Sequence, residues 1–340
     1  MKAVRIVHPG SFDGLMVSQE DVPTPGRREV LMRVRAASLN YRDMVAAFGH
    51  YPNMGAKPVP LSDGAGDVVA IGPGVTKFNP GDRVSPSCMP DWTGGHFDGA
   101  DHRLSLGFSA DGLLSEYVLL HENAFVALPD YLSYEEAAAL PCAAVSAWSA
   151  LTFGLPLHAG HTVLIQGTGG VALFGLQIAR MFGARVLAIT SSKDKVRKLM
   201  DLGAAAVVNY RETPEWGAAI LKLTGGRGVD KVVEIGGEST IQQSINCTRV
   251  GGEIGLVGFV TGVAGGLPPM EILKKSITIK GISIGSRQSF EAMLAAMAAT
   301  QVRPVLDLVY PFRDYKDAYR RLESAGHIGK IVIRIGDDDL

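Results

Sequence analysis

The sequence predicts an α/β fold in which a doubly wound parallel sheet is inserted into a β-rich domain. Three observations predict it. A glycine-rich turn joins an apolar strand to a helix near residue 167. From residue 163 onward strands and helices alternate, which is typical of a doubly wound parallel sheet. The segments before and after this region instead carry short strands broken by glycine and proline.

The inserted region opens with a β-α-β unit. Residues 163–165 form an apolar strand, Gly167-Thr168-Gly169-Gly170 makes a tight turn, and a helix that begins at Val171 precedes a second strand at 185–189. Glycine lets the backbone approach a pyrophosphate closely, and the free N–H groups at the helix start meet the phosphate charge. The small Ala172 takes the third position of the glycine pattern. The unit therefore predicts a dinucleotide site.

The other elements follow in order. Within the inserted region we expect further strands at 206–209, 229–235 and 253–258, and helices at 193–202, 215–223 and 241–248. Before it we expect strands at 1–7, 30–36, 66–71 and 114–120, and a helix at 134–140 with Ser133 as its N-cap. After it come a helix at 290–300 and a strand at 331–335. This order predicts one discontinuous domain of residues 1–129 and 283–340, with residues 130–282 as the inserted domain.

Composition argues against several classes of protein. Hydrophobic residues make up 46% of the 340 residues and charged residues 20%, which suits a globular enzyme with an ample core. The net charge of −1, without a block of like charges, argues against nucleic acid or a membrane surface as a partner. No apolar run is long enough for a signal peptide or a membrane span. The three cysteines, Cys88, Cys142 and Cys247, are widely spaced, which favours a reducing cytoplasm over a disulfide framework. With nucleic acid and membranes disfavoured, we expect a small-molecule substrate.

Five motifs carry a resemblance to a known family. They are Gly64-Ala65-Gly66-Asp67-Val68-Val69, Asn79-Pro80-Gly81-Asp82-Arg83-Val84, the turn at Gly167, Gly228-Val229-Asp230 and Gly329-Lys330-Ile331-Val332-Ile333. Over nearly its whole length the chain resembles the medium-chain dehydrogenase/reductase superfamily. The resemblance implies a GroES-like β domain with an inserted Rossmann domain. It also implies hydride transfer between NAD(P)H and alcohols, carbonyls, quinones or activated alkenes.

The positions that match the family's catalytic zinc ligands are altered. Asn40 and Ser62 stand where zinc alcohol dehydrogenases place a cysteine and a histidine, and only Cys142 is retained. One thiolate, an amide and a hydroxyl hold zinc poorly, although Asp63 could add an oxygen ligand. The structural zinc lobe is missing as well, since residues 86–112 contain Cys88 as their one cysteine. We therefore expect no zinc.

A loop at residues 94–111 offers a second candidate metal site. His96, Asp101 and His102 lie within seven residues of each other. Their spacing is not the helical i, i+4 spacing, and a loop has no preset ligand geometry. The loop is interpreted as a surface or substrate-lid segment.

The residues Leu39 to Asp43 resemble the site of zinc-free quinone oxidoreductases. By that resemblance, the amide of Asn40 donates to a carbonyl oxygen, and the hydroxyl of Tyr41 donates a hydrogen bond or a proton. Asn40 and Tyr41 are therefore the predicted catalytic residues. The alternatives are that Asn40 forms a turn before a helix and that Tyr41 is a core aromatic at a strand end.

The end of the second inserted strand indicates the cofactor. NAD-specific folds carry an acidic residue there, whereas this chain has Thr190, followed by Ser191, Ser192 and Lys193. By resemblance to NADPH-dependent quinone reductases, Ser191, Lys195 and Tyr210 would hold a 2′-phosphate, with Ser192 beside them. We therefore expect NADPH, with NADH as the alternative if the lysines only begin a solvated helix.

The resemblance implies further contacts and an assembly. The remaining predicted cofactor residues are Ser146, Gly258, Phe259, Val260, Gly285, Ser286 and Lys330. The apolar strand at 277–279 lies where family members pair sheets across a homodimer, although it could equally be an internal strand. The leading hypothesis is an NADPH-dependent, metal-independent reductase of a quinone or an α,β-unsaturated carbonyl. An alcohol dehydrogenase, kept open by Cys142, and a non-catalytic NADPH-binding protein are the alternatives.

Overall fold

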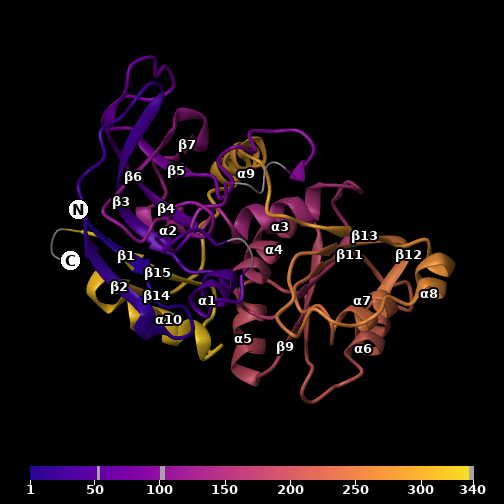
Figure 1. The fold of residues 1–340 in the computed structure, drawn as a ribbon. Helices are drawn as coiled ribbons and strands as arrows, with labels where there is room; N and C mark the ends of the chain where they lie inside the picture. Colours follow the sequence, from indigo (N-terminus) through magenta and orange to yellow (C-terminus); the bar gives the residue numbers. More distant parts are fainter. Residues whose placement is uncertain (52–53, 100–103, 337–340) are drawn as a thin grey trace. The chain divides into compact units, whose positions relative to one another are not determined.

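The computed structural model describes residues 1–51, 54–99 and 104–336, which form two compact units. The first unit comprises Met1–Val145 and Gly285–Leu340, and the second comprises Ser146–Ile284. Both ends of the chain thus build one unit, and the second unit is inserted into it (Figure 1). This arrangement confirms the predicted fold class.

The first boundary between the units differs from the predicted one. The sequence placed it after residue 129, whereas the structure places it after Val145. The reason is α2 (Tyr134–Ala138), which packs against strands β3 (Glu29–Ser38) and β4 (Asp63–Ile71) of the first unit. The N-cap of α2 is the predicted one, because the Ser133 hydroxyl accepts a hydrogen bond from the Glu136 N–H.

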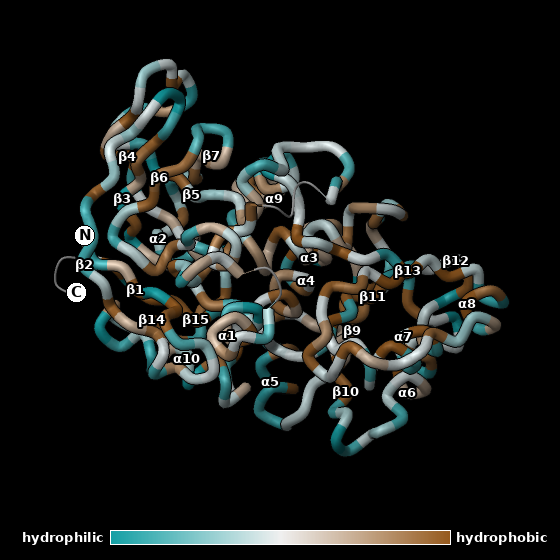
Figure 2. The backbone as a smooth tube through the Cα atoms, viewed as in Figure 1, coloured by the Kyte–Doolittle hydropathy of each residue, from teal (hydrophilic) through white to brown (hydrophobic). Residues whose placement is uncertain are grey.

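The second unit contains a six-stranded parallel sheet with the strand order β10-β9-β8-β11-β12-β13. The strands are β8 (Thr162–Gln166), β9 (Arg185–Thr190), β10 (Ala206–Asn209), β11 (Val229–Glu234), β12 (Thr248–Leu256) and β13 (Thr278–Gly281). The helices are α4 (Gly170–Met181), α5 (Lys193–Asp201), α6 (Trp216–Leu223), α7 (Ile241–Cys247) and α8 (Pro269–Lys275). Every residue of β8 and β11 is buried, as expected for parallel strands covered on both faces. Figure 2 shows the hydrophilic colouring of α5, which consists mostly of charged residues.

The first unit contains a seven-stranded sheet and a two-stranded ribbon. The larger sheet has the order β14-β15-β3-β4-β5-β7, with β6 also paired to β3, and the ribbon pairs β1 with β2. The strands not yet bounded are β1 (Lys2–Ile6), β2 (Leu15–Gln19), β5 (Arg83–Pro86), β6 (Tyr117–His121), β7 (Phe125–Ala127), β14 (Leu306–Pro311) and β15 (Lys330–Arg334). The helices are α1 (Tyr41–Ala47), α9 (Arg287–Thr300) and α10 (Tyr315–Glu323), while α3 (Ala143–Thr152) begins at the boundary. Met32, Phe125 and Tyr319 belong to one hydrophobic core.

Most predicted elements are present with shifted ends, and several elements were not predicted. The expected strand at 206–209 has the observed bounds, whereas the expected strand at 253–258 begins earlier, at Thr248. The helices α1, α3, α8 and α10 and the strands β2, β5, β7 and β14 were not predicted. In the part of the chain that the structure describes, no helix is long and apolar enough to cross a membrane.

Candidate active site

The start of α1 carries the two residues predicted to act on a substrate. Asn40 is the N-cap of the helix, and its backbone N–H donates to the Asp43 carboxylate at 2.7 Å. Asn40 therefore does precede a helix, as one of its two interpretations held. Tyr41 is the first helical residue, and its side chain is 37% exposed, so it is not a core aromatic at a strand end.

Lys330 fixes the orientation of the Asn40 side chain. Its Nζ donates to Asn40 Oδ1 and to the Leu39 carbonyl oxygen, each at 2.6 Å, and lies 3.4 Å from Asp63 Oδ2. Lys330 is the first residue of β15 and is buried, so this ammonium is rigidly placed. Because it occupies the amide oxygen, Nδ2 is the end of the Asn40 amide left to donate. That nitrogen is buried and has no hydrogen-bond partner in the described part of the chain.

A second cluster combines Asp63, Cys88 and Cys142. One ligand atom from each, a carboxylate oxygen and two sulfurs, lies within 4.8 Å of the others, and all three residues are buried. Cys88 Sγ donates to Asp63 Oδ1 at 3.2 Å, and the Ser62 hydroxyl donates to the same oxygen at 3.0 Å. The sequence assigned Cys88 to the lost zinc lobe and did not bring it to Cys142, so this grouping is new.

Burial governs the charges around these groups. It raises the pKa of Asp43 to about 7, an effect that Arg42 opposes and that the neighbouring Asp63 carboxylate reinforces. Burial also raises the pKa of the Cys88 thiol well above its usual range, and a hydrogen bond with Cys142 adds to the increase. Without a metal, Cys88 is therefore a neutral thiol at physiological pH, as its donation to Asp63 requires.

The Asp63, Cys88 and Cys142 cluster offers donor atoms of the kind that bind zinc. Two sulfurs and one carboxylate oxygen match the number and type of ligands in a catalytic zinc site. The Lys330 ammonium, however, already neutralises Asp63 as a cation supplied by the protein itself. The ligand atoms of the cluster thus suit a zinc ion, but the negative charge of Asp63 is already balanced by Lys330 when no ion is bound. In the other candidate metal site, Asp101 and His102 lie outside the described residues, and His96 is exposed.

The predicted dinucleotide turn lies between β8 and α4 in the second unit. Gly167 has φ +79°, a left-handed conformation that favours glycine, and its N–H donates to the Ile189 carbonyl at 2.7 Å. Thr168 is buried, Gly169 is the N-cap of α4, and Gly170 and Val171 open the helix. No side chain caps this end, so the N–H groups of the first turn are open to a phosphate, as a bound dinucleotide requires.

A buried polar network that the sequence did not reveal supports this turn. Gln166, at the end of β8, donates from Nε2 to Glu234 Oε2 at 2.6 Å. Its Oε1 accepts from the N–H groups of Ile235 and Gly236, each at 3.2 Å, and Glu234 Oε1 accepts from Gly236 and Gly237. The carboxyl ends of β8 and β11 are therefore tied together, which holds the strand ends where ligands bind in open α/β sheets.

The residues predicted to hold a 2′-phosphate gather at the ends of β9 and β10. Thr190 is paired with Asn209 across the two strands, and the Tyr210 N–H donates to the Thr190 carbonyl at 2.9 Å. Ser191 follows directly and is half-buried. The Ser192 hydroxyl accepts from the Lys195 N–H at 3.4 Å, which makes Ser192 the N-cap of α5.

The other predicted cofactor residues are distributed over both units. In the second unit, Gly258 follows β12, where a Cβ would lie 2.5 Å from the Ile235 carbonyl oxygen, and Phe259 and Val260 are exposed. Ser146 is buried in α3. In the first unit, Gly285 precedes Ser286, whose hydroxyl caps α9 by accepting from the Ser289 N–H at 3.2 Å.

Two family models match the chain. The one described as an alcohol dehydrogenase GroES-like domain matches residues 26–130, and the one described as a zinc-binding dehydrogenase matches residues 170–299. Among curated proteins, a zinc-type alcohol dehydrogenase-like protein of Schizosaccharomyces pombe is 41% identical and covers 97% of this chain and 98% of its own length. A quinone oxidoreductase of Rattus norvegicus is 28% identical and covers 98% and 97%.

Solved structures agree with this picture. A putative alcohol dehydrogenase of Sinorhizobium meliloti superposes with a TM-score of 0.92 and 38% identity, covering 98% of each chain. A mycobacterial protein in complex with NADPH superposes with a TM-score of 0.83 and 25% identity, covering 98% of this chain and 100% of its own. Both comparisons cover 98% of this chain and so include both units.

Proposed function

The chain belongs to the medium-chain dehydrogenase/reductase superfamily, and we propose that it reduces a quinone or an α,β-unsaturated carbonyl with NADPH and without a metal. As a member of that family it is a nicotinamide-dependent oxidoreductase, whose relatives are named alcohol dehydrogenases and quinone oxidoreductases. The acceptor, the preference for NADPH and the metal independence are the proposal.

The orientation of the Asn40 amide carries the proposal. Lys330 holds Oδ1 at 2.6 Å, so the unpartnered Nδ2 is a preorganised donor for an acceptor oxygen. Donors that are fixed before the reaction stabilise developing negative charge without a reorganisation cost. Asn40 thus offers, without a metal, the polarisation that a zinc ion gives in other members of the family.

The remaining roles follow from the side chains beside Asn40. When bound, the nicotinamide supplies the hydride. As hydride reaches the acceptor, negative charge develops on its oxygen, and Asn40 Nδ2 donates a hydrogen bond to that oxygen. The Tyr41 hydroxyl, the neighbouring exposed group, donates the hydrogen bond or proton that completes the reduction. Lys330 acts through Asn40 as a positioning residue.

The preference for NADPH rests on the end of β9. Thr190 and Ser191 place hydroxyls there in place of the acidic residue that selects NAD, and the backbone contact with Thr190 keeps Tyr210 beside them. A 2′-phosphate therefore meets hydroxyl groups at this edge and no carboxylate from the strand end.

The three cysteines are free thiols, which agrees with a cytoplasmic location.

The test is the rate of NADPH and NADH oxidation with a small quinone and an enone, with and without a strong chelator. We expect turnover that prefers NADPH and survives chelation. Asn40→Ala and Tyr41→Phe should each lower kcat by about tenfold to a thousandfold. The matched controls are Asn123→Ala and Tyr117→Phe, in other parts of the same unit. Unchanged turnover in both site variants would reject their roles.

The Asp63–Cys88–Cys142 cluster favours a second candidate, a zinc-dependent alcohol dehydrogenase. These three residues would hold the ion, which would polarise an alcohol or carbonyl oxygen. This candidate predicts stoichiometric zinc in the purified protein, loss of turnover on chelation, and loss of both zinc and activity in Cys88→Ser and Cys142→Ser. Turnover that persists in metal-free protein would exclude it.

A further inference from the structure

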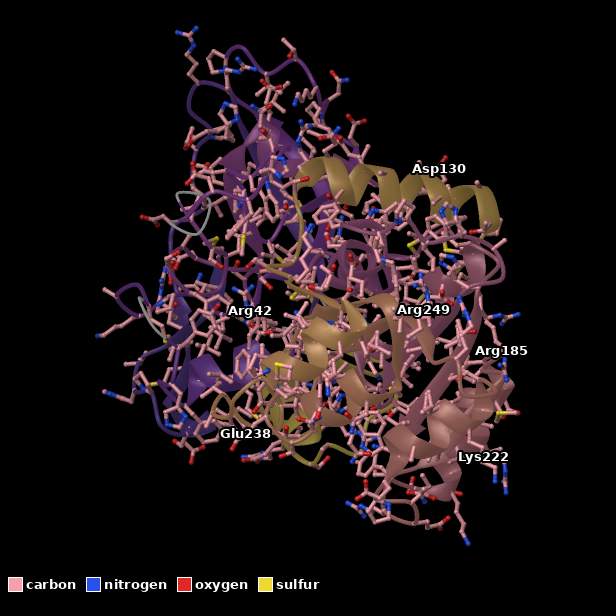
Figure 3. The ribbon with its side chains drawn as sticks, turned by 90° about the vertical axis from the view of Figure 1, so that its right-hand side faces the viewer. Arg42, Asp130, Arg185, Lys222, Glu238 and Arg249 are labelled. Atoms are coloured by element: carbon pink, nitrogen blue, oxygen red, sulfur yellow. The ribbon has the colours of Figure 1, made fainter. Side chains whose placement is uncertain are left out.

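Arg42, the second residue of α1, forms no ion pair with a carboxylate among the residues that the structure describes. Its Nη2 donates to the Ser105 hydroxyl at 2.7 Å. Its guanidinium carbon lies 3.9 Å from the centre of the Phe108 ring and 5.6 Å from that of Tyr51. Among the described residues no carboxylate forms an ion pair with it, whereas Arg227 and Arg249 both pair with Asp230. Figure 3 labels Arg42 among the side chains of the first unit.

Two donors at this position have no acceptor within the described ranges 1–51, 54–99 and 104–336. Arg42 Nε and Asn40 Nδ2 are both buried, and neither has a hydrogen-bond partner there. Buried donors are nearly always satisfied, because each one left unpaired costs free energy. Two such donors, two residues apart in sequence, therefore indicate that the acceptor is a ligand. The Arg42 side chain as a whole remains partly accessible, so a ligand can reach it.

A purely structural role accounts poorly for this arginine. A methionine or leucine would pack between Phe108 and Tyr51 without the cost of removing a charge from water. The aromatic faces and the Ser105 hydroxyl hold the guanidinium plane in one orientation, which suits recognition of an anion by a planar fork of donors. The arrangement is that of a prepared anion site.

We infer that Arg42 and Asn40 together bind an oxyanion of the acceptor. The inference rests on the proposed function and deepens it. The oxyanion has two sources: a carboxylate that the acceptor carries before reaction, or the enolate or hydroquinone oxygen that becomes negative as hydride arrives. In the first case Arg42 selects acidic acceptors, and in the second it assists Asn40 in the transition state.

Kinetics with a matched pair of acceptors separates the two sources. The pair is an enone that carries a carboxylate and its methyl ester, and the variants are Arg42→Met and Arg42→Lys. For a substrate carboxylate, Arg42→Met should raise KM about tenfold or more for the acid and leave the ester unchanged. For a developing oxyanion, kcat should fall by a similar factor for both. Arg42→Lys, which keeps the charge and serves if Arg42→Met does not fold, should show a smaller effect of the same kind.

The control is Arg320→Met, which removes an exposed arginine paired with Asp317 in the same unit. Values within about twofold of the wild type for both acceptors in both Arg42 variants would overturn the inference.

A binding measurement works without turnover. 4-Nitrophenol titrated by the absorbance of its phenolate should bind to the wild type with a lowered apparent pKa, because the site favours the anion. Arg42→Met should abolish that shift, and Arg320→Met should retain it. If the apparent pKa of bound 4-nitrophenol is lowered but the protein reduces no acceptor, the anion site is supported and the proposed function is rejected. No shift in the wild type would overturn the anion site, whatever the turnover.

Discussion

A single ammonium group determines which end of the Asn40 amide is presented to an acceptor. If Lys330 acts by holding Oδ1 at 2.6 Å, Lys330→Met frees the amide to rotate and should lower kcat by about tenfold or more. The same substitution made together with Asn40→Ala should cause little further loss, because the two residues act as a unit. Steady-state kinetics of the four proteins in this cycle provides the measurement. If the loss of kcat in the double variant equals the product of the two single losses, Lys330 does not act through Asn40.

Asp43 predicts how stability depends on pH. Its pKa is about 7 in the folded protein and near 3.8 when unfolded, so the folded state binds the extra proton between these values. Stability therefore falls as pH rises from about 4 to about 7, by up to about 4 kcal/mol. Asp43→Asn should remove this loss, so that it stabilises the protein more at about pH 8 than at about pH 5.

Urea unfolding of wild type and Asp43→Asn at the two pH values measures this difference. The exposed Asp21→Asn is the matched control and should show no such difference. The groups that face Asp43 are Arg42, Asp63, Lys330 and Tyr319, and the substitution leaves all four side chains in place. An equal effect of Asp43→Asn at both values would contradict the raised pKa.

Only part of the candidate site could be predicted from its residues. Asn40 and Tyr41 are adjacent in a recognisable run, so their shared location followed from the sequence. Cys88 was missed because it follows β5 in a stretch without periodicity, and pairing of β5 with β4 brings it to Asp63. The contact between Lys330 and Asn40 joins residues far apart in sequence, since β15 pairs with the end of β3. Local pattern cannot reveal such pairing.

Among the elements, α10 has a helical hydrophobic pattern in its sequence, although it was not predicted as a helix. Tyr315, Ala318, Tyr319 and Leu322 are buried at the i, i+3, i+4 and i+7 spacing of an amphipathic helix. The seven-residue α1 offers no such repeat, because it is too short to show one. The presence of the strands in the second unit was predicted well, since buried strands such as the largely apolar β8 alternate with helices.

The pairing of β11 with β12 carries a buried ion pair. Lys231 and Glu253 are register partners, their Nζ and Oε1 lie 2.6 Å apart, and both side chains are at most 2% exposed. Lys231→Met leaves the Glu253 charge unpaired and should lower the free energy of unfolding by about 3–5 kcal/mol. Adding Glu253→Gln should recover much of this loss, since a neutral amide can still accept from the Leu155 N–H. Denaturant unfolding measures the free energy of unfolding of each variant. An equal loss of stability in Lys231→Met and in the double variant would contradict this explanation.

For the whole molecule, the two-unit organisation follows from the order of elements. Both ends of the chain carry strands of one sheet, because β15 pairs with β3, and the β8 to β13 segment closes its own sheet. The unit boundary was the less predictable feature. Whether α2 belongs to one unit or the other depends on packing against β3 and β4, which the local sequence does not encode.

The β13 edge of the second sheet argues for a homodimer. β13 ends the strand order and has β12 as its one partner in the described chain, with Thr278 and Gly281 exposed. A strand edge that is left open tends to pair with another strand, and pairing with a second copy across a two-fold axis satisfies it. We therefore expect a mass of about twice the 36.0 kDa of one chain by light scattering. Thr278→Pro removes a backbone N–H and should shift the protein towards monomer, whereas Thr278→Val keeps the N–H and should remain dimeric. A wild-type protein of single-chain mass would show that the edge is protected in another way.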